Sequence, residues 1–508
     1  MIAFAAAPKI EAEQADAYLG VRQATPPIRR AKVDRSEDRR EVRAKFDAAS
    51  DSVEYQNYWA NADSYDADSA HSKSVRQRLV KRSRYEVGNN GFADGIIQTH
   101  ANFLVGIGPK LRVIGVSNAK EIEKAWTRWA KRIQLRRKLW CMSHAKTQDG
   151  EAFAMLIHNP RLADRVQLDI VLIETEQVQT PYLPYRAEGV IDGVTFDRFG
   201  NVLTYDILPQ HPGGQWAVYY QTPQTVPARF VLHWFQLRRP GQHRGIPEFR
   251  STLQVGASSR RWREATVSAA ETAASFAAAI ETDMPAGDAD PIRPFDTFEI
   301  ERRTGAALPM GWKLNQMRAE HPNATYEAFS KGQINEQARP KSMPYNLAAC
   351  DSSSYNYASG KLDHQTYFVG LDVEREDGND LVLDPLFSAW YSEAAPVYGW
   401  DREEPEVAWD WPQHPVADVV SEASAQDTKL KNGTLSLSLA YSNAGEEYAE
   451  QLATMATDYG VPVERVQEML RLAIFNATNQ IGSIEQAKVQ RDVGLARQAN
   501  QQTQEATQ

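Results

Sequence analysis

A long uninterrupted helix is the feature that most constrains how this chain can fold. It follows a β-branched and aromatic run, Val231 to Phe235, that predicts a buried strand, and a basic, turn-rich link over 238–245. Pro247 is tolerated in a first helical turn, and from there to Ile280 the chain has no further proline and one glycine, Gly256. At 1.5 Å per residue, this stretch predicts a single rod about 50 Å long.

The surface of this rod carries small side chains where an amphipathic helix usually carries Leu, Ile or Phe. Alanines recur at every fourth position, at Ala265, Ala269, Ala273 and Ala277. Methyl groups bury little apolar area at about 25 cal/mol per Å². The stripe therefore indicates either an internal helix of a large domain or a surface that packs against copies of the same chain. Five charged residues between 260 and 271 interrupt the apolar run, so we do not expect a membrane span.

The size and composition of the chain set the class of protein. Its 508 residues allow about three domain-sized units. A net charge of −9 argues against a protein that coats nucleic acid in general. The spacing of the two cysteines, Cys141 and Cys350, matches no metal site, and their small number suits a reducing compartment. We find neither a signal peptide nor a run of 18 apolar residues, so we expect a soluble, intracellular protein with no anchor.

The part of the chain before the rod predicts helices followed by strands. Residues 121–142 predict a helix with a buried tryptophan stripe, and eight lysines and arginines between Lys120 and Lys138 suggest a solvated face. Strands are expected at 153–157 and 166–173, and a hairpin at 193–208.

The part after the rod predicts a small β excursion between two helices. Five prolines lie between 281 and 322, together with a strand pair expected at Thr297–Arg302 and Trp312–Met317. A second helix is expected from Ala324 to about Arg339. Another helix follows from 358, with a break at Glu374–Asp380.

Several short segments, in this order, resemble the portal proteins of tailed bacteriophages, the lambda-like family in particular. They are RSR…NNGFADGIIQTHANFLVGIGPKL (82–111), HWFQLRRPGQHRGIPEF (233–249) with the long Ala/Glu/Arg helix, the Asp351–Gly360 segment, VAWDWP (407–412) and QDTKLKNGTL (426–435). The resemblance covers roughly residues 70 to 475. Each segment is short, and their shared order carries the resemblance.

The resemblance implies a mixed α+β subunit of portal type that assembles as a ring. Its parts are expected to be an N-terminal arm (1–68), a wing of helices and β-rich structure (69–245), a first stem helix (246–281), a clip (282–321), a second stem helix (322–341), a tunnel loop (342–357), a helix returning to the wing (358–424), a helical crown (425–478) and a Gln-rich, disordered tail (479–508).

The resemblance also assigns candidate site residues. The DNA channel is expected to be lined by Arg339, Lys341, Ser342, Met343, Tyr345, Asn346, Ser352 and Ser353. Subunits are expected to pack through Ala265, Ala269, Ala273 and Ala277. The clip is expected to face the terminase through Arg293, Glu299, Arg302, Arg303 and Lys313. Because few cations lie in the tunnel loop, it would not grip DNA too tightly for translocation.

The sequence contains none of three common catalytic motifs. No Gly-x4-Gly-Lys-Ser/Thr loop, Gly-x-Ser-x-Gly elbow or His-Glu-x-x-His sequence occurs. His233 and His243 lack an acidic or cysteine partner at ligand spacing, so we interpret them as structural. We therefore expect no enzyme activity, no cofactor and no metal.

The function implied is that of a portal, the ring at a unique capsid vertex through which DNA is packaged and ejected. The expected partners are further copies of the chain, a dodecamer by family analogy, double-stranded viral DNA, the terminase large subunit, the major capsid protein or scaffold, and a head-completion, adaptor or tail protein. The expected location is the virion after assembly in the host cytoplasm, with no membrane contact. The alternatives are another ring-forming head–tail connector and an α+β enzyme.

Overall fold

The computed structural model describes residues 59, 61–180, 189–215, 221–274, 278–282, 312–316, 323–415, 419–443 and 448–476. The chain divides into two units, and the fold described below belongs to the unit that begins at Tyr65. None of the described helices has the length and apolarity needed to cross a lipid bilayer.

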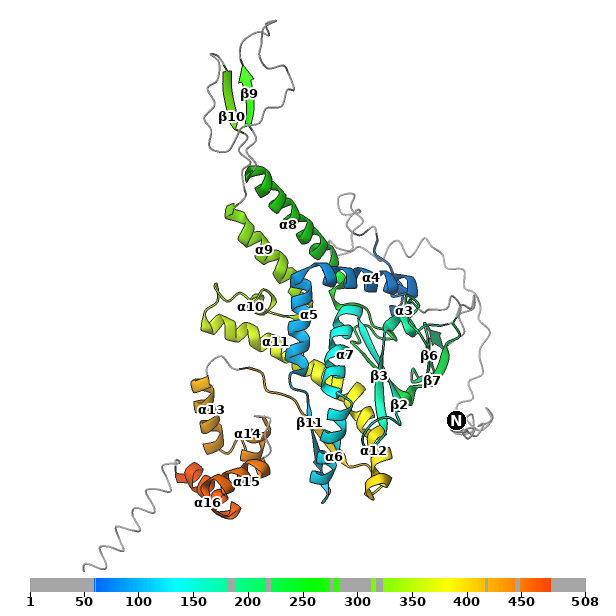
Figure 1. Ribbon diagram of the computed structural model, residues 1–508, viewed down its shortest axis with the longest axis vertical. Helices are drawn as coiled ribbons and strands as arrows, with labels where there is room; N and C mark the ends of the chain where they lie inside the picture. The colour runs from blue at the N-terminus through cyan, green and yellow to red at the C-terminus, as the bar shows by residue number, and fades with distance from the viewer. Residues whose placement is uncertain are drawn as a thin grey trace, which may run out of the picture. The chain divides into compact units, whose positions relative to one another are not determined.

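The first half of this unit begins with helices (Figure 1). They are α3 (Ala67–Ala70), α4 (Lys73–Asn89), α5 (Gly91–Val105), α6 (Ala119–Arg132) and α7 (Leu135–Asp149). Asn90 separates α4 from α5, and its side chain accepts a hydrogen bond from the Phe92 N–H and caps α5.

Three antiparallel sheets belong to the same unit. The first has the order β3 (Leu168–Ile173), β2 (Glu151–His158) and β8 (Val231–Phe235). The second consists of β4 (Val190–Ile191), β5 (Val194–Phe196), β6 (Val202–Ile207) and β7 (Gln224–Pro227) in that order, and the third pairs β1 (Lys110–Ile114) with β11 (Glu406–Asp410). The strands expected at 153–157, 166–173 and 231–235 and the β5–β6 hairpin are confirmed.

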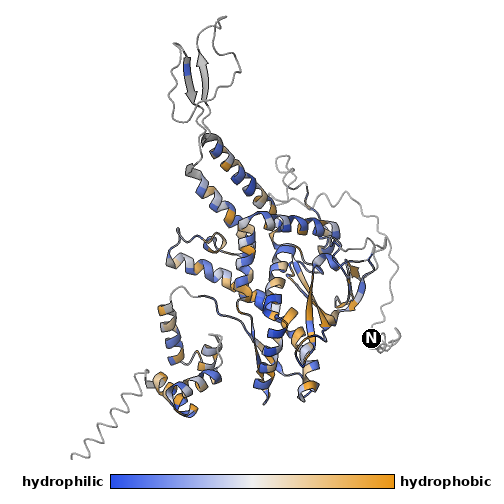
Figure 2. Ribbon diagram, in the orientation of Figure 1, coloured by the Kyte–Doolittle hydropathy of each residue, from blue (hydrophilic) through white to orange (hydrophobic). Residues whose placement is uncertain are grey.

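The main core lies where α5, α6, α7 and α12 (Asp384–Tyr398) meet the sheet of β2. Trp126 and Trp129 of α6 are buried against Trp390 of α12, with ring centroids 5.2 and 6.0 Å from that of Trp390. The tryptophan stripe expected at 121–142 is thus buried at these two positions, but the single helix expected there is divided into α6 and α7 at Ile133 and Gln134. A smaller apolar cluster forms where β2 packs near β6 through Phe153 and Tyr205. Figure 2 shows hydrophobic residues concentrated in these inner strands.

Two helices, here called the stem pair, join the main core at one end. They are α8 (Leu253–Ala274) and α9 (Asn323–Ala338), with the strands β9 (Ala278–Thr282) and β10 (Trp312–Gln316) between them in sequence. The expected rod is therefore shorter than predicted, because Ala278–Ile280 lie in a strand. Ile280 pairs with Leu314 in the antiparallel β9–β10 register, and this long-range pairing overrides the helix preference of the alanines.

One strand of the expected pair between the stem helices lies among the described residues. The strand at Trp312–Gln316 is confirmed, but its partner is β9. The segment Thr297–Arg302, which we expected to be that partner, lies outside the described residues.

The helix after the stem pair does not break where we expected. After α10 (Tyr345–Ala348), α11 (Tyr357–Gly378) continues through a π-helical turn (Asn379–Leu383) into α12 (Asp384–Tyr398). Pro385 follows this wide turn directly, and the irregular turn accommodates a residue that has no backbone N–H to donate. Gly378 allows close approach of Trp234, since a Cβ at this position would lie 3.2 Å from that ring.

The last described helices are α13 (Val419–Lys431), α14 (Leu437–Asn443), α15 (Tyr448–Tyr459) and α16 (Val463–Asn476). Leu452, Ala456 and Val466 form a small apolar cluster of their own between α15 and α16. The domain boundaries expected from the resemblance stay predictions.

Candidate functional site

The stem pair is held together by aromatic side chains. The ring of Trp262 on α8 stacks on Tyr326 of α9, with centroids 4.8 Å apart, and meets Phe329 edge-on at 4.6 Å. Aromatic pairs of this geometry contribute about 0.5–1.5 kcal/mol beyond their buried area. The two helices therefore form a unit without a thick core between them.

The outer surface of α8 is open in the isolated subunit. Ala265 and Ala269 are exposed, and Val267 between them is 58% exposed. The side chains of Ala273 and Ala277 lie outside the described residues. Packing of the alanine stripe against a second copy stays a prediction, and the exposed face leaves room for it.

One of the five expected clip residues can be located. Lys313 is exposed on β10, while Arg293, Glu299, Arg302 and Arg303 lie outside the described residues. The terminase-facing role of this set stays a prediction.

The segment expected to line the channel is part surface and part core. Arg339, Ser352 and Ser353 are exposed, and Ser342 and Asn346 are half-buried. Among the other expected residues, Met343 is buried in the main core and Tyr345 packs against that core. An apolar side chain inside the subunit cannot also face an aqueous channel, so Met343 is removed from the expected channel lining.

Lys341 is the second correction to this set. Its side chain is 4% exposed, and its Nζ lies 2.5 Å from a Glu248 carboxylate oxygen and 3.0 Å from one of Glu374. Because both carboxylates hold this ammonium group inside the subunit, it is not placed to contact a DNA phosphate. Arg339 is left as the exposed cation of the expected set.

Lys341 belongs to a buried group of ionisable side chains, here called the Lys–Glu cluster. Its five members are His100, Lys146, Glu248, Lys341 and Glu374. Lys146 lies 3.1 Å from Glu248 and 2.6 Å from Glu374, and His100 Nε2 lies 3.1 Å from Glu374. Two lysines and two glutamates balance in charge, which is the arrangement that lets charges persist in a low-dielectric interior.

The pKa values in the Lys–Glu cluster support this charge state. Burial disfavours ionisation of Glu248, but Lys146 and Lys341 outweigh it and lower the pKa of Glu248 to about 2. Burial likewise opposes the charge of Lys146, and its two glutamates still raise its pKa. Burial and the Lys341 charge lower the pKa of His100, so its imidazole is neutral near pH 7.

A second buried group, here called the Glu151 cluster, lies at the start of β2. Arg244 donates to both carboxylate oxygens of Glu151, with nitrogen–oxygen distances of 2.6–3.1 Å. His233 Nε2 lies 3.1 Å from Glu151, and Arg76 pairs with Asp192 beside them. Burial would raise the pKa of Glu151, but Arg244, His233 and Arg76 hold it well below its usual range.

The backbone around the Glu151 cluster is packed too closely for any side chain but hydrogen. A Cβ on Gly245 would lie 2.2 Å from the carbonyl oxygen of Gly150, and one on Gly150 would lie 2.0 Å from a backbone carbon of Ile246. The Gly245 N–H also donates to Glu151 over 2.8 Å. Glycine at these two positions therefore lets the backbone at the start of β2 pack directly against His243–Gly245, in the link that leads to the stem pair.

The two histidines of the resemblance segment make structural contacts, as we interpreted them. His233 is buried between Glu151 and the Tyr205 hydroxyl, and His243 Nδ1 lies 2.8 Å from a carboxylate oxygen of Asp68.

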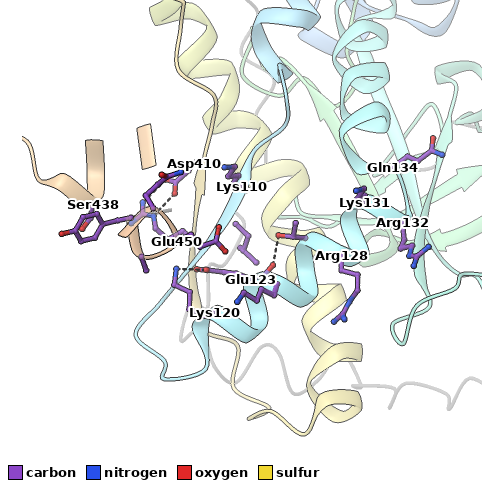
Figure 3. Close-up of a pocket in the computed structure, with 17 residues that line it drawn as sticks. Lys110, Lys120, Glu123, Arg128, Lys131, Arg132, Gln134, Asp410, Ser438 and Glu450 are labelled. Carbon is purple, nitrogen blue, oxygen red and sulfur yellow. Dashed lines mark hydrogen bonds and ion pairs between the residues drawn. The ribbon is translucent and has the colours of Figure 1, made fainter. Parts of the chain in front are cut away.

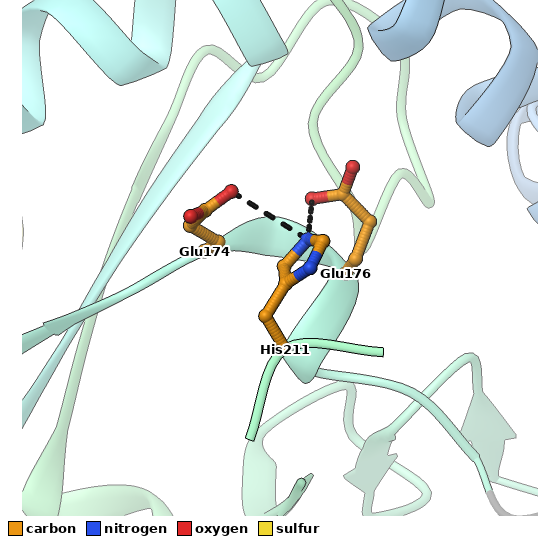
Figure 4. Close-up of side chains that lie close together, drawn as sticks. All are labelled: Glu174, Glu176 and His211. Atoms are coloured by element: carbon orange, nitrogen blue, oxygen red, sulfur yellow. Dashed lines mark ion pairs between the residues drawn. The ribbon is translucent and has the colours of Figure 1, made fainter. Parts of the chain in front are cut away.

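Glu174, Glu176 and His211 come close enough together to suggest a cation site (Figure 4). Two features oppose a metal ion there. Arg84 already pairs with both carboxylates, at 3.1 Å from Glu174 and 3.0 Å from Glu176. His211 Nδ1 accepts the Gly213 N–H at 3.0 Å, so its Nε2 carries the proton and points it at the carboxylates. The group is explained by ion pairing.

Sequence reasoning missed the Lys–Glu and Glu151 clusters because their members are distant along the chain. Glu151 and Arg244 are separated by 93 positions, and Lys146 and Glu374 by 228. One local signal was present, because Glu151 is a charged residue at the start of an apolar strand and therefore requires a partner where it is buried. Identifying that partner required the fold.

Comparison with known proteins identifies one family whose model matches this chain. A family model described as "Phage portal protein, lambda family" matches residues 55–373. A chain in the virion of a native gene transfer agent particle is 13% identical, with 72% of this chain and 93% of that chain covered and a TM-score of 0.40. A chain in the neck of an empty particle of the same kind, with C6 symmetry, is 13% identical, with 71% and 91% covered and a TM-score of 0.42. No curated protein matches.

Proposed function

This chain belongs to the lambda family of phage portal proteins, and on that premise we propose that it forms a ring at one vertex of a capsid. Viral DNA passes through the axial channel of that ring during packaging and ejection. The ring is a dodecamer, it is assembled in the host cytoplasm, and it resides in the mature virion.

The proposal rests on one observation, which is that both ends of the stem pair are attached to the main core. Glu248, just before α8, and Lys341, just after α9, meet in the same buried cluster. Both ends of the stem pair are thus anchored inside the subunit, while the outer face of α8 stays open at Val267. A helix pair that is anchored at both ends and exposed on one face suits a subunit whose exposed face packs against a neighbouring subunit in a ring.

The exposed part of the expected tunnel loop suits a surface past which DNA slides. Ser352, Ser353 and Ser354 are exposed, and the one acid beside them, Asp351, accepts the N–H of Ser353. Each lysine or arginine that contacts a phosphate releases counterions and strengthens binding regardless of base sequence. A loop of neutral hydroxyl groups, repeated around a ring, would hold DNA loosely enough to move.

The proposed partners follow from this arrangement. The segment between α8 and α9, which includes Lys313, docks the terminase large subunit, whose ATPase drives packaging. The rest of the ring contacts the major capsid protein or scaffold and a head-completion, adaptor or tail protein. The portal family is structural, so no catalytic role is proposed.

Imaging of the purified full chain by negative-stain electron microscopy tests the proposal. We expect rings with an axial hole. A uniform population of monomers would favour an enzyme, and closed particles without a hole would favour a different connector. Exchange of residues 282–321 for the corresponding part of an unrelated portal should keep the rings and abolish binding of the terminase.

Replacement of Ala269 with Leu tests where subunits meet. Ala269 is exposed in the single subunit, so the change should leave subunit stability within about 0.5 kcal/mol. A close contact between subunits would be overpacked by about 1–3 kcal/mol at each boundary. We therefore expect fewer rings in size-exclusion chromatography at unchanged thermal stability. Unchanged ring yield would show that this position faces solvent or the channel.

A further inference from the structure

Helix α6 carries a charged face that the proposed function does not use. Its inner side buries Trp126 and Trp129, whereas Lys124, Arg128 and Lys131 are exposed on the other side. Every exposed residue of α6 is polar or charged. Figure 3 shows Arg128, Lys131 and Arg132 projecting from this helix beside a cleft that is also lined by Lys110 and by three acidic residues, Glu123, Asp410 and Glu450.

Positive charge is concentrated in this region of an acidic protein. Between Lys110 and Lys138 there are ten lysines and arginines against two acidic residues, a net charge of +8 in a chain whose total is −9. Charge segregation on this scale produces a local positive potential that the overall charge conceals.

Much of this charge is not neutralised inside the subunit. Arg112 pairs with Asp410 and Lys138 with Asp169. Within the described part of the chain, Lys124, Lys131 and Arg132 make no ion pair, and Arg128 donates to the Tyr398 hydroxyl at 3.4 Å. Ion pairs within the subunit thus involve Arg112 and Lys138, whereas Lys124, Arg128, Lys131 and Arg132 are available to an external anion.

We propose that the basic face of α6, formed by Lys124, Arg128, Lys131 and Arg132, binds the phosphate backbone of double-stranded DNA outside the axial channel. The inference rests on the proposed function, which brings packaged DNA to the protein. Figure 1 shows α6 at the opposite end of the core body from α8 and α9. This surface is thus separate from the stem pair and from the exposed serines of the tunnel loop.

The dimensions of the basic face suit a DNA backbone. At 1.5 Å per residue, the four cations extend over about 12 Å of α6. DNA carries one negative charge per about 1.7 Å of its axis, so several phosphates lie within reach of this length. Long lysine and arginine side chains can follow the backbone without a fixed register, and contacts of this kind position DNA without reading its sequence.

The chemistry of the face favours DNA over an acidic protein segment. Protein partners are held mainly by a buried apolar or aromatic centre, with charged residues at the rim. The exposed side of α6 offers no apolar residue for such a centre, since Thr127 is its one uncharged exposed position. A surface of cations and hydroxyl groups matches sequence-independent phosphate binding.

The test uses the full-length protein with Lys124, Arg128 and Lys131 all replaced by Glu, and a milder variant with all three replaced by Gln. The matched control replaces Arg78, Lys81 and Arg82 with Glu, because these are three exposed cations on α4 without an ion pair in the described residues. Binding of a fluorescent 30-base-pair duplex is followed by anisotropy over a salt series. Negative-stain imaging of each sample reports ring formation separately.

We expect the wild-type protein to bind the duplex with an affinity that falls as salt rises. Loss of three phosphate contacts should reduce the slope of log K against log salt by about 2.7 and weaken binding at least about tenfold at low salt, while the α4 control changes little. Equal binding by the wild-type protein and both α6 variants overturns the proposal. The proposal is also overturned if the α6 variants lose binding to polyglutamate but keep binding to DNA, because the face would then bind an acidic protein. If the samples form no rings but the α6 variants still bind DNA more weakly than the wild-type protein, the proposed function is refuted and this inference holds.

Discussion

Lys341 Nζ lies 3.0 Å from a carboxylate oxygen of Glu374, which joins the end of the stem pair to the C-terminal part of α11 inside the subunit. Glu248, five residues before the start of α8, contacts the same ammonium group. The stem pair and α11 therefore share one buried charge cluster. A rotation of the stem relative to α11 would separate buried charges, so these elements are expected to move together.

Removal of one partner from the Lys–Glu cluster should destabilise the subunit strongly. Lys341→Met leaves two buried carboxylates with one lysine, and breaking a buried pair in this way costs about 3–5 kcal/mol. Denaturant unfolding measures the change. Lys361→Met is the control, because Lys361 is exposed on α11 and its loss should cost less than about 0.5 kcal/mol.

A double variant sharpens this prediction. Lys341→Met combined with Glu374→Gln removes one charge of each sign, so it should be less destabilising than the sum of the two single changes. Additive effects would show that the two side chains are not coupled. If a Lys341 variant packages DNA poorly, we attribute the defect to lost stability of the subunit, because the Lys341 side chain does not face DNA.

The stability of the subunit should fall with acid in two windows. His100 has a pKa below 6.5 when folded, so the unfolded chain binds the extra proton first and stability decreases as pH drops below about 6.5. Glu248 has a folded pKa of about 2 against 4.5 for the free group, so its contribution is present above 4.5 and is lost between 4.5 and 2.

Unfolding free energies measured from pH 8 to pH 3 test both windows. His100→Gln should flatten the decrease below pH 6.5, because it removes the titrating group while an amide keeps hydrogen-bonding capacity toward Tyr367 and Glu374. The same change at His158, which is exposed, should leave the profile as it is. A profile identical in the wild-type protein and the His100 variant would contradict the assignment.

Gly245 should tolerate no side chain. In Gly245→Ala the new Cβ would meet the Gly150 carbonyl oxygen at 2.2 Å, and the neighbouring backbone has no room to shift because Gly150 is itself packed on Ile246. We expect destabilisation of at least about 3 kcal/mol, at or above the usual cost of overpacking.

The matched control for Gly245 is Gly95→Ala in α5. A Cβ on Gly95 meets nothing within 4 Å, so alanine should stabilise the helix by about 0.5–1 kcal/mol. Thermal unfolding separates the two outcomes. An equal melting temperature for Gly245→Ala and the wild-type protein would mean that the close approach is not present in solution.

The elements that local signals specify were predicted from the sequence, and those that depend on long-range pairing were not. The buried strands, the β5–β6 hairpin and the tryptophan face of α6 follow from alternation, turn residues and helical spacing. Ala278–Ile280 belong to β9 because of the partner strand β10, which no local pattern reveals.

The same limit applies to the candidate site. Lys341 is flanked by polar and proline residues and was expected at the surface, yet Glu248 and Glu374 bury it from positions 93 and 33 residues away in the chain. Ser352 and Ser353, with no such partners, lie exposed as the composition of their segment indicated. Charged side chains are thus where sequence-based placement failed, since a buried charge is set by its partners.

Added positive charge in the exposed part of the tunnel loop should slow DNA movement. Ser352→Lys with Ser353→Lys places two cations per subunit at exposed positions, and in a ring of twelve, the proposed assembly, this adds 24 phosphate-binding groups. Each contact lowers the free energy of bound DNA irrespective of sequence. We expect normal rings and terminase binding, with a packaging rate reduced at low salt and restored as salt rises. The control adds the same charge at two exposed positions of α4, Ser74→Lys with Asn89→Lys, and should package normally. Packaging by the loop variant at the wild-type rate at every salt concentration would place this loop away from the DNA path.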